Sequence, residues 1–362
     1  MTNHAVAAQP ISRCAAERPR IVAIGGGTGL PSILKGLRQQ CGCTTSASAC
    51  DCVTAIATVT DDGGSSGRLR EQFGMLPPGD IRNCLAALAS DDSPIAALMQ
   101  HRFDGSGELR GHTVGNLLIA ALTEMTGDFQ AAIENLSRML KVHGAVLPST
   151  LESVTLRADF EGGEQLSGET AIVARRRPIK RLSLARPARP LPEALRALIN
   201  ADIVVVGPGS LYTSILPNLL VGGMASTLSG IGAVRIYVAN LMTEPGETDG
   251  MSLEDHIRVI YEHVGFDLFD YILVNRRPVP AHVIHRYHAF GANPIVRTDD
   301  TARASAQLVE RDLAWTIEGG RIRHAPRDVA AAILELGRSG RPERECATTA
   351  AAPVLCAHAT PR

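Results

Sequence analysis

The fold of this chain is decided by the stretch Ile21-Val22-Ala23-Ile24-Gly25-Gly26-Gly27-Thr28-Gly29. A short β-branched run ends there in a glycine-rich turn, and apolar residues at helical spacing follow in Leu30-Pro31-Ser32-Ile33-Leu34-Lys35-Gly36-Leu37. This pattern predicts a strand, a tight turn and a helix. In such a unit the unpaired N–H groups and the positive end of the helix dipole favour an anion, to which Thr28 can add a hydroxyl.

The same pattern recurs along the chain. Strands are expected at Val53–Val59, Ile203–Val206, Arg235–Ala239 and Tyr271–Val274, each followed by a polar or glycine-rich turn and then by a helical segment. Alternating strands and helices predict an α/β fold: a doubly wound, Rossmann-like parallel sheet with helices on both faces. Ligands of such sheets bind where the carboxyl ends of the strands emerge.

Composition narrows the class of protein. The 362 residues carry 36 Lys+Arg against 37 Asp+Glu, so no global field recruits nucleic acid or an anionic membrane. No segment approaches the roughly 18 apolar residues of a membrane-spanning helix, and residues 1–20 lack the apolar core of a secretory signal. We therefore expect a cytoplasmic protein without membrane insertion, whose eight cysteines are reduced thiols.

A single domain is expected over residues 20–337, with disordered tails at 1–19 and 338–362. Helices are expected at Val114–Met125, Asp128–Leu140 and Asp328–Leu336. Polar and apolar residues alternate in Leu151–Phe160 and Glu169–Leu184, which predicts an inserted β-meander subdomain at about residues 145–190.

Two strand ends are candidate anion sites. The first is the turn at Gly25–Gly29, which is not the dinucleotide fingerprint because Leu30 stands where a third spaced glycine is needed. The second is Gly207–Ser210, followed by the hydroxyls of Thr213 and Ser214. Two such turns on one sheet fit a nucleotide diphosphate. A third strand end, Asn240–Thr248, carries carboxylates and hydroxyls that could bind a sugar or ribose.

Other polar motifs admit two interpretations. Asp61 and Asp62 end the second strand and could hold a divalent cation, or they could cap a solvated turn. Asp80 is expected to be a helix N-cap. His112 has no Ser or Cys at a recognisable spacing, so a structural or ligand-contacting role is expected.

Two further motifs are interpreted as carrying no chemistry. The spacing of Cys41, Cys43, Cys50 and Cys52 is poor for zinc, and the basic run Arg175-Arg176-Arg177 is expected to be a solvated strand face.

Together, six blocks of sequence resemble the bacterial gluconeogenesis factor (YvcK-like) family. They are Gly25–Leu30, Val59–Arg70, Pro77–Arg82, Gly111-His112 with Gly115-Asn116, Gly207–Ser214, and Asn240–Thr243 with Pro245–Thr248. The resemblance covers about Pro19 to Leu336 with the blocks in the family's order. It implies the fold of the 2-phospho-L-lactate transferases (CofD-like), which bind a nucleotide and a divalent metal.

The resemblance implies a regulatory protein that binds a UDP-sugar of the UDP-N-acetylglucosamine type and supports cell shape and wall-precursor supply during gluconeogenic growth. Protein partners in cell-wall precursor synthesis and a homo-oligomer are compatible with it; nucleic acid is not. By similarity, eight residues fall on nucleotide- and phosphate-binding positions: Gly26, Gly27, Thr28, Gly209, Ser210, Asn218, Tyr287 and Arg323. Tyr287 would stack on the base, and Arg323 would hold the diphosphate.

The alternative is a metal-dependent 2-phospho-L-lactate-type transferase acting on a nucleotide-activated substrate. Only then would Asp61 and Asp62 bind Mg²⁺; the regulatory interpretation requires neither a metal nor catalysis. Two departures from the family affect ligand identity. Glu244 stands where the family usually has Gln, and Arg276-Arg277 replaces a smaller polar pair.

Overall fold

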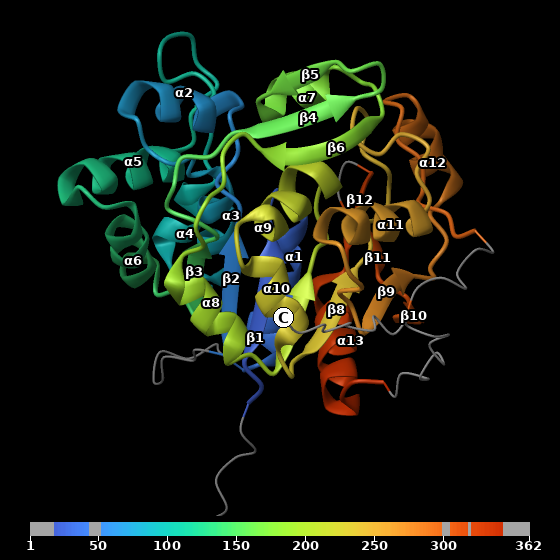
Figure 1. The fold of residues 1–362 in the computed structure, drawn as a ribbon. Helices are drawn as coiled ribbons and strands as arrows, with labels where there is room; N and C mark the ends of the chain where they lie inside the picture. The colour runs from blue at the N-terminus through green and yellow to red at the C-terminus, as the bar shows by residue number, and fades with distance from the viewer. Residues whose placement is uncertain (1–17, 43–51, 299–304, 318–319, 343–362) are drawn as a thin grey trace, which may run out of the picture.

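The main body of the protein is a seven-stranded parallel sheet with helices on both faces, as predicted. The computed structural model describes residues 18–42, 52–298, 305–317 and 320–342. The strand order is β10-β9-β8-β7-β1-β2-β3 (Figure 1). The strands are β1 (Ile21–Gly25), β2 (Val53–Ala57), β3 (Ala145–Pro148), β7 (Ile203–Val206), β8 (Val234–Val238), β9 (Tyr271–Asn275) and β10 (Gln307–Arg311).

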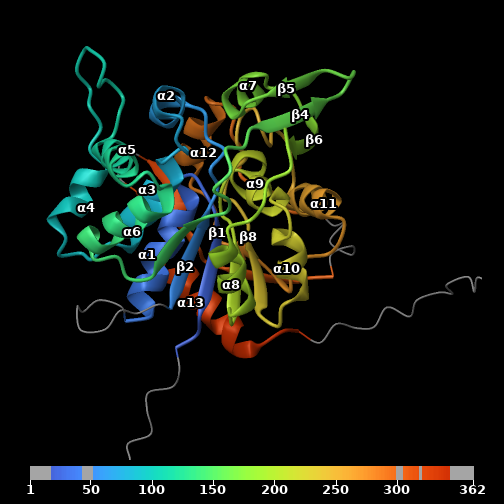
Figure 2. The same cartoon turned by 60° about the vertical axis from the view of Figure 1, so that its left-hand side comes forward.

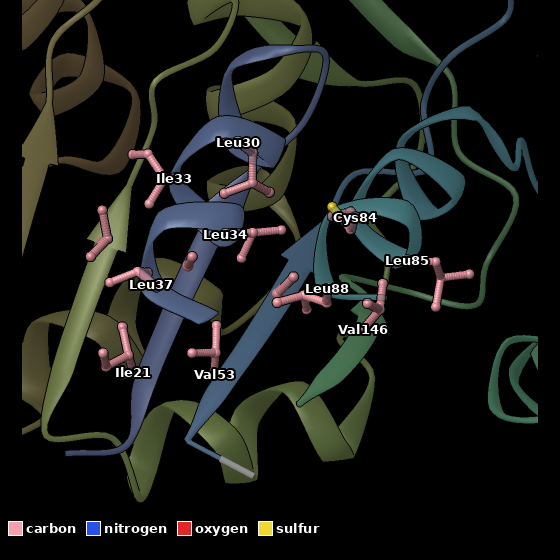
Figure 3. Close-up of a cluster of buried hydrophobic side chains, with 14 of the residues drawn as sticks. Ile21, Leu30, Ile33, Leu34, Leu37, Val53, Cys84, Leu85, Leu88 and Val146 are labelled. Atoms are coloured by element: carbon pink, nitrogen blue, oxygen red, sulfur yellow. The ribbon is translucent and has the colours of Figure 1, made fainter. Parts of the chain in front are cut away.

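One face of the sheet packs against the helices that follow β1 and β2. Helix α1 (Gly29–Gln40) and helix α3 (Gly79–Leu88) each place apolar residues three and four positions apart on β1, β2 and β3, as Figure 3 shows. The same layer contains α2 (Gly64–Phe73), α4 (Pro94–Met99), α5 (Val114–Thr126), α6 (Phe129–Leu140) and α13 (Pro326–Ser339).

The opposite face is covered by five further helices and by the insertion. The helices are α8 (Pro192–Ile199), η1 (Leu211–Ile215, a π-helical turn), α9 (Leu216–Leu220), α10 (Met224–Gly230) and α11 (Leu253–Val264). Every residue of β1 is buried, as expected for a central parallel strand with both faces covered.

The insertion is a separate three-stranded antiparallel sheet, at the top of the molecule in Figures 1 and 2. Its strands are β4 (Leu156–Phe160), β5 (Gln165–Ser167) and β6 (Ile179–Leu184), in the order β5-β4-β6. Two details differ from the sequence prediction. The segment Glu169–Leu184 is helix α7 (Glu169–Ala174) followed by β6, and β3 pairs with β2 in the main sheet.

A small C-terminal layer completes the fold. Helix α12 (Ala281–His288) lies against a hairpin of β11 (Ala314–Ile317) and β12 (Arg321–His324). The predicted helix at Asp328–Leu336 extends over Pro326–Ser339. The predicted tails lie outside the described residues except for 18–19 and 338–342. Within the described residues, no helix combines the length and apolarity that crossing a bilayer requires.

The strand order places the two predicted anion turns side by side. From β1 the chain proceeds outward to β2 and β3, then returns to the other side of β1 as β7 and continues outward to β10. The direction in which successive strands are added to the sheet therefore reverses between β1 and β7. Gly25–Gly29 follows β1 and Gly207–Ser210 follows β7, so both turns lie at the switch point where ligands of doubly wound sheets bind.

Candidate functional site

A cavity of about 570 Å³ lies beyond the carboxyl ends of β1, β7 and β8. Both predicted anion turns form its floor, and α12 and the β11–β12 hairpin form its wall. Its lining residues are Gly27, Thr28, Gly29, Ser32, Pro208, Gly209, Ser210, Asn240, Leu241, Met242, Thr243, Glu244, Pro245, Arg286, Tyr287, Phe290, Ala292 and Arg321–His324. Six of the eight predicted nucleotide-binding residues therefore meet at one cavity.

The first turn is held by two side chains of α3. Gly27 adopts a left-handed backbone conformation (φ 63°) that glycine tolerates best. Its N–H donates to Asp80 Oδ1 at 2.9 Å, and its carbonyl accepts from Asn83 Nδ2 at 3.3 Å. Asp80 was expected to cap its own helix; instead Pro78 is the N-cap, and the Asp80 carboxyl fixes the turn.

The second turn is held by residues that follow β8. Gly209 N–H donates to Asn240 Oδ1, and Asn240 Nδ2 donates back to Gly209 O, both at 2.9 Å. The Ser210 hydroxyl donates to Glu244, and the Thr213 hydroxyl donates to Glu247 at 3.2 Å. Of the polar groups after β8 that are predicted to bind a sugar or ribose, Asn240, Thr243 and Glu244 line the cavity, and binding of a sugar there stays a prediction.

The two turns touch. A Cβ atom on Gly29 would lie 2.6 Å from the carbonyl oxygen of Pro208, so only a residue without a side chain permits this approach. Gly29 begins the twelve-residue helix α1, and within the described residues the side chain of its N-cap, Thr28, makes no capping bond. The positive end of α1 therefore faces the cavity beside the second turn.

Three cationic side chains also line the cavity. Arg321 and Arg323 come from β12 and Arg286 from α12, against the single lining carboxyl of Glu244. Burial raises the pKa of Glu244, while the bond from Ser210 and the charge of Arg323 act in the opposite direction. Three guanidinium groups against one carboxyl make the cavity suitable for an anion with two or more phosphate oxygens.

Tyr287 joins α12 to the hairpin. Its hydroxyl accepts from the backbone N–H of Ile322 at 3.1 Å, and its ring packs against Met242 and Val283 while also lining the cavity. The hydroxyl of Tyr287 is thus engaged within the protein. Stacking of its ring on a base stays a prediction.

Two predicted residues do not line the cavity. Asn218 is fully buried, and its Nδ2 donates to Gly25 O at 2.9 Å and to Ser214 O at 2.7 Å, which ties α9 to the end of β1. A Cβ atom on Gly26 would lie 2.3 Å from Asp80 Oδ2, so this glycine leaves room for the carboxyl behind the turn. Both residues support the turns from below.

Asp61 and Asp62 point to different partners. Asp61 Oδ1 accepts from Gly63 N–H at 2.9 Å, whereas Asp62 Oδ1 accepts from the N–H and hydroxyl of Thr170 in α7 at 2.9 and 2.7 Å. Among the described residues, no three His, Cys, Asp or Glu side chains converge as a metal site would require. These bonds occupy Oδ1 of each carboxylate, and binding of Mg²⁺ by the pair stays a prediction of the transferase alternative.

Several carboxyls near these strand ends hold protons tightly. Burial raises the pKa of Asp80 to about 7, that of Glu247 to about 8 and that of Glu169 to about 9. Negative neighbours add to each shift. The charge of Asp61 raises the pKa of both Asp80 and Glu169, and the charge of Glu244 raises the pKa of Glu247. These three carboxyls therefore carry less negative charge near neutral pH than the sequence alone suggests.

His112 has a serine partner that sequence spacing did not reveal. Its Nδ1 lies 2.9 Å from Ser65 Oγ, and Asn116 Nδ2 donates to the same oxygen at 3.0 Å. Burial lowers the pKa of His112, which favours the neutral ring that can accept a hydrogen bond from the serine hydroxyl. These three residues connect α2 to α5 and do not line the cavity.

The described residues of the motifs interpreted as unreactive do not line the cavity, and Arg175–Arg177 form the turn after helix α7 rather than the predicted strand face. Arg175 and Arg177 on the insertion pair with Glu164 at 2.9 and 3.1 Å. Cys41, Cys52 and Cys84 are thiols, while Cys43 and Cys50 lie outside the described residues.

Sequence reasoning did not identify Asn83, Arg286, Phe290 or Arg321. The first lies one turn beyond Asp80, and the other three belong to a layer with no glycine-rich motif. The available signal was a sequence rich in arginine, with six arginines in residues 286–323, which does not indicate which of them face a cavity.

Comparisons with known proteins identify the family of the chain. Residues 21–314 match the family model of 2-phospho-L-lactate transferase CofD. The chain is 41% identical to the gluconeogenesis factor of Bacillus subtilis, over 88% of this chain and 98% of that protein. It is 40% identical to that of Listeria monocytogenes, over 91% and 98%.

A solved structure is also similar. The crystal structure of a UPF0052 family member from Bacillus halodurans superimposes with a TM-score of 0.80 at 40% identity, covering 87% of this chain and 99% of that one. The chain belongs to the gluconeogenesis factor family, within the wider CofD family.

Proposed function

We propose that the protein is a regulatory protein that binds a nucleotide sugar, of the UDP-N-acetylglucosamine type, in the cavity at the switch point. One observation carries this proposal: two preformed anion turns and three arginines line a single cavity. Backbone N–H groups and guanidinium groups are suitable donors to a diphosphate, and the volume suits a nucleotide.

The physiological part of the proposal follows from the family. Relatives are named gluconeogenesis factors, and we infer that this chain, in the cytoplasm, couples wall-precursor supply and cell shape to gluconeogenic growth. Its partners would be proteins of cell-wall precursor synthesis. We prefer this function to the transferase alternative because Asp61 and Asp62 are engaged with Gly63 and Thr170.

Calorimetric titration of the purified protein with UDP-N-acetylglucosamine, GDP and NAD, with and without Mg²⁺, tests the proposal. We expect binding of UDP-N-acetylglucosamine that is indifferent to Mg²⁺. Binding of GDP alone, and only with Mg²⁺, would favour the transferase. Absence of binding to all three would contradict the proposed function.

A further inference from the structure

Phe290 is a large apolar side chain left in water at the rim of the cavity. Its exposed fraction is 71%, and it lines the cavity just beyond the end of α12. Aromatic side chains are normally buried, because their large apolar area is costly to hydrate. An exposed ring on the wall of a polar cavity is what a ligand with a flat apolar face would cover.

The backbone under Phe290 is fixed in place. Phe290 N–H and Ala292 N–H both donate to Tyr287 O, at 2.9 and 3.0 Å. Gly291 between them adopts φ 85°, which closes the turn. Two bonds then join this turn to the segment after β8, from Thr243 N to Asn293 O at 2.7 Å and from Asn293 N to Thr243 Oγ1 at 2.9 Å.

The position of the ring is therefore set by the same segment that holds the second anion turn. Asn240 clamps Gly209, and three residues later Thr243 anchors the turn that carries Phe290. A rigid backbone beneath an exposed aromatic ring lowers the entropic cost of binding a flat group.

Tyr287, the other aromatic residue of the cavity, is placed differently. Its hydroxyl is engaged by Ile322, and its ring packs within the small apolar cluster of Met242, Val283 and Ile322. Its contacts connect helix α12 to the β11–β12 hairpin. Phe290, in contrast, offers its ring to whatever enters the cavity.

We propose that Phe290 is the platform on which the planar base of the nucleotide stacks, so that it selects ligands carrying a base. This inference rests on the proposed function and deepens it. The two turns take the phosphates at the floor, and the base reaches the rim at Phe290. A sugar ring, rich in hydroxyls, gains less from an apolar face than a base does.

The experiment compares a ligand that has a base with one that lacks it. UDP-N-acetylglucosamine and inorganic pyrophosphate are titrated into the wild type and into the variants Phe290→Ala, Phe290→Leu and Phe290→Tyr. Leucine keeps apolar volume without a π face, and tyrosine restores the ring. Phe266→Ala is the matched control, because Phe266 is also exposed (37%) but lies outside the cavity lining.

We expect Phe290→Ala and Phe290→Leu to bind UDP-N-acetylglucosamine about tenfold more weakly or worse, as for loss of one base stacked on an aromatic ring. Phe290→Tyr and Phe266→Ala should match the wild type. Affinity for pyrophosphate should be the same in all five proteins. Where pyrophosphate binds too weakly to measure, the contrast between the leucine and tyrosine variants decides.

Wild-type affinity for the nucleotide in Phe290→Ala would overturn the platform and leave the proposed function standing. Equal loss of nucleotide and pyrophosphate would also overturn it, because the residue would then shape the cavity rather than read the base. A wild-type protein that binds neither probe would instead refute the proposed function itself.

Discussion

The two anion turns fix a glycine peptide by the same arrangement but with different chemistry. In each, both the N–H and the carbonyl of one glycine are held by side chains from another element. At the first turn the acceptor is the carboxyl of Asp80. At the second turn Asn240, a neutral amide, both accepts and donates.

This difference shows that preorganisation can be either sensitive or insensitive to pH. Burial raises the pKa of Asp80 to about 7, so its charge changes within the physiological range. The amide of Asn240 has no such titration. The first turn should therefore respond to pH, whereas the clamp on the second glycine should not.

The largest effect is expected from a substitution at the contact between the two turns. Gly29→Ala would set a methyl group 2.6 Å from the oxygen of Pro208. We expect it to separate the turns, costing about 1–3 kcal/mol of stability by overpacking. Nucleotide binding should weaken by about 3 kcal/mol or more, as for two charge-assisted hydrogen bonds.

Calorimetry and thermal unfolding measure both effects. Gly230→Ala in α10 is the control, because its Cβ would meet no atom within 4 Å. Wild-type nucleotide affinity in Gly29→Ala would show that the two turns need not touch.

Arg323 tests the second turn, since it lies near Glu244, which accepts from Ser210. Arg323→Ala should weaken nucleotide-sugar binding by about 1.5–3 kcal/mol, with little change in thermal stability. Arg311→Ala, which removes a surface ion pair with Glu335, serves as the control. Loss of folding with retained affinity would identify Arg323 as structural.

The pH response separates the two clamps. The folded-state pKa of Asp80, about 7, exceeds its ordinary value of 3.8, so the folded protein holds this proton more tightly. The contribution of this proton to the free energy of unfolding is complete below about pH 4 and is lost as pH rises through 7. Asp80→Asn keeps an oxygen acceptor for Gly27 and cannot titrate.

Relative to the wild type, Asp80→Asn should therefore gain roughly 1–3 kcal/mol in unfolding free energy between pH 5 and pH 8. Urea unfolding at both values measures this gain. Asn240→Ala, at the second turn, should change stability equally at both. The same pH dependence in Asp80→Asn and wild type would remove the distinction between the turns.

The smallest effect is expected at Asp62, which belongs to neither turn. Asp62→Asn preserves an oxygen for the N–H and hydroxyl of Thr170. Nucleotide affinity should change by no more than about 1 kcal/mol, comparable to one ordinary hydrogen bond. A loss of binding that appears only with Mg²⁺, together with release of UDP or GDP by the wild type, would favour the transferase.

The features predicted from the sequence are those that depend on a few neighbouring residues. Buried β-branched runs followed by glycine-rich turns identified β1 and β7 together with both anion turns, because strand and turn preferences act over a few residues. The six-residue helix α7 was predicted as a strand, since a segment so short carries almost no helical periodicity.

The contacts that preset the site could not be predicted. Asp80 and Gly27 are 53 residues apart, and Asn240 and Gly209 are 31 apart. Nothing local distinguishes an aspartate that caps its own helix from one that reaches another turn. Phe290 was likewise invisible, because a pattern of residues does not reveal which aromatic ring the fold leaves exposed.

A crystal structure of the protein with UDP-N-acetylglucosamine tests the central claim most directly. We predict that the diphosphate lies between the two turns, with its oxygens within hydrogen-bond distance of backbone N–H groups in residues 28–30 and 210–211, and with Arg323 on the opposite side. A diphosphate that contacts only one turn, or that binds outside this cavity, would contradict the account.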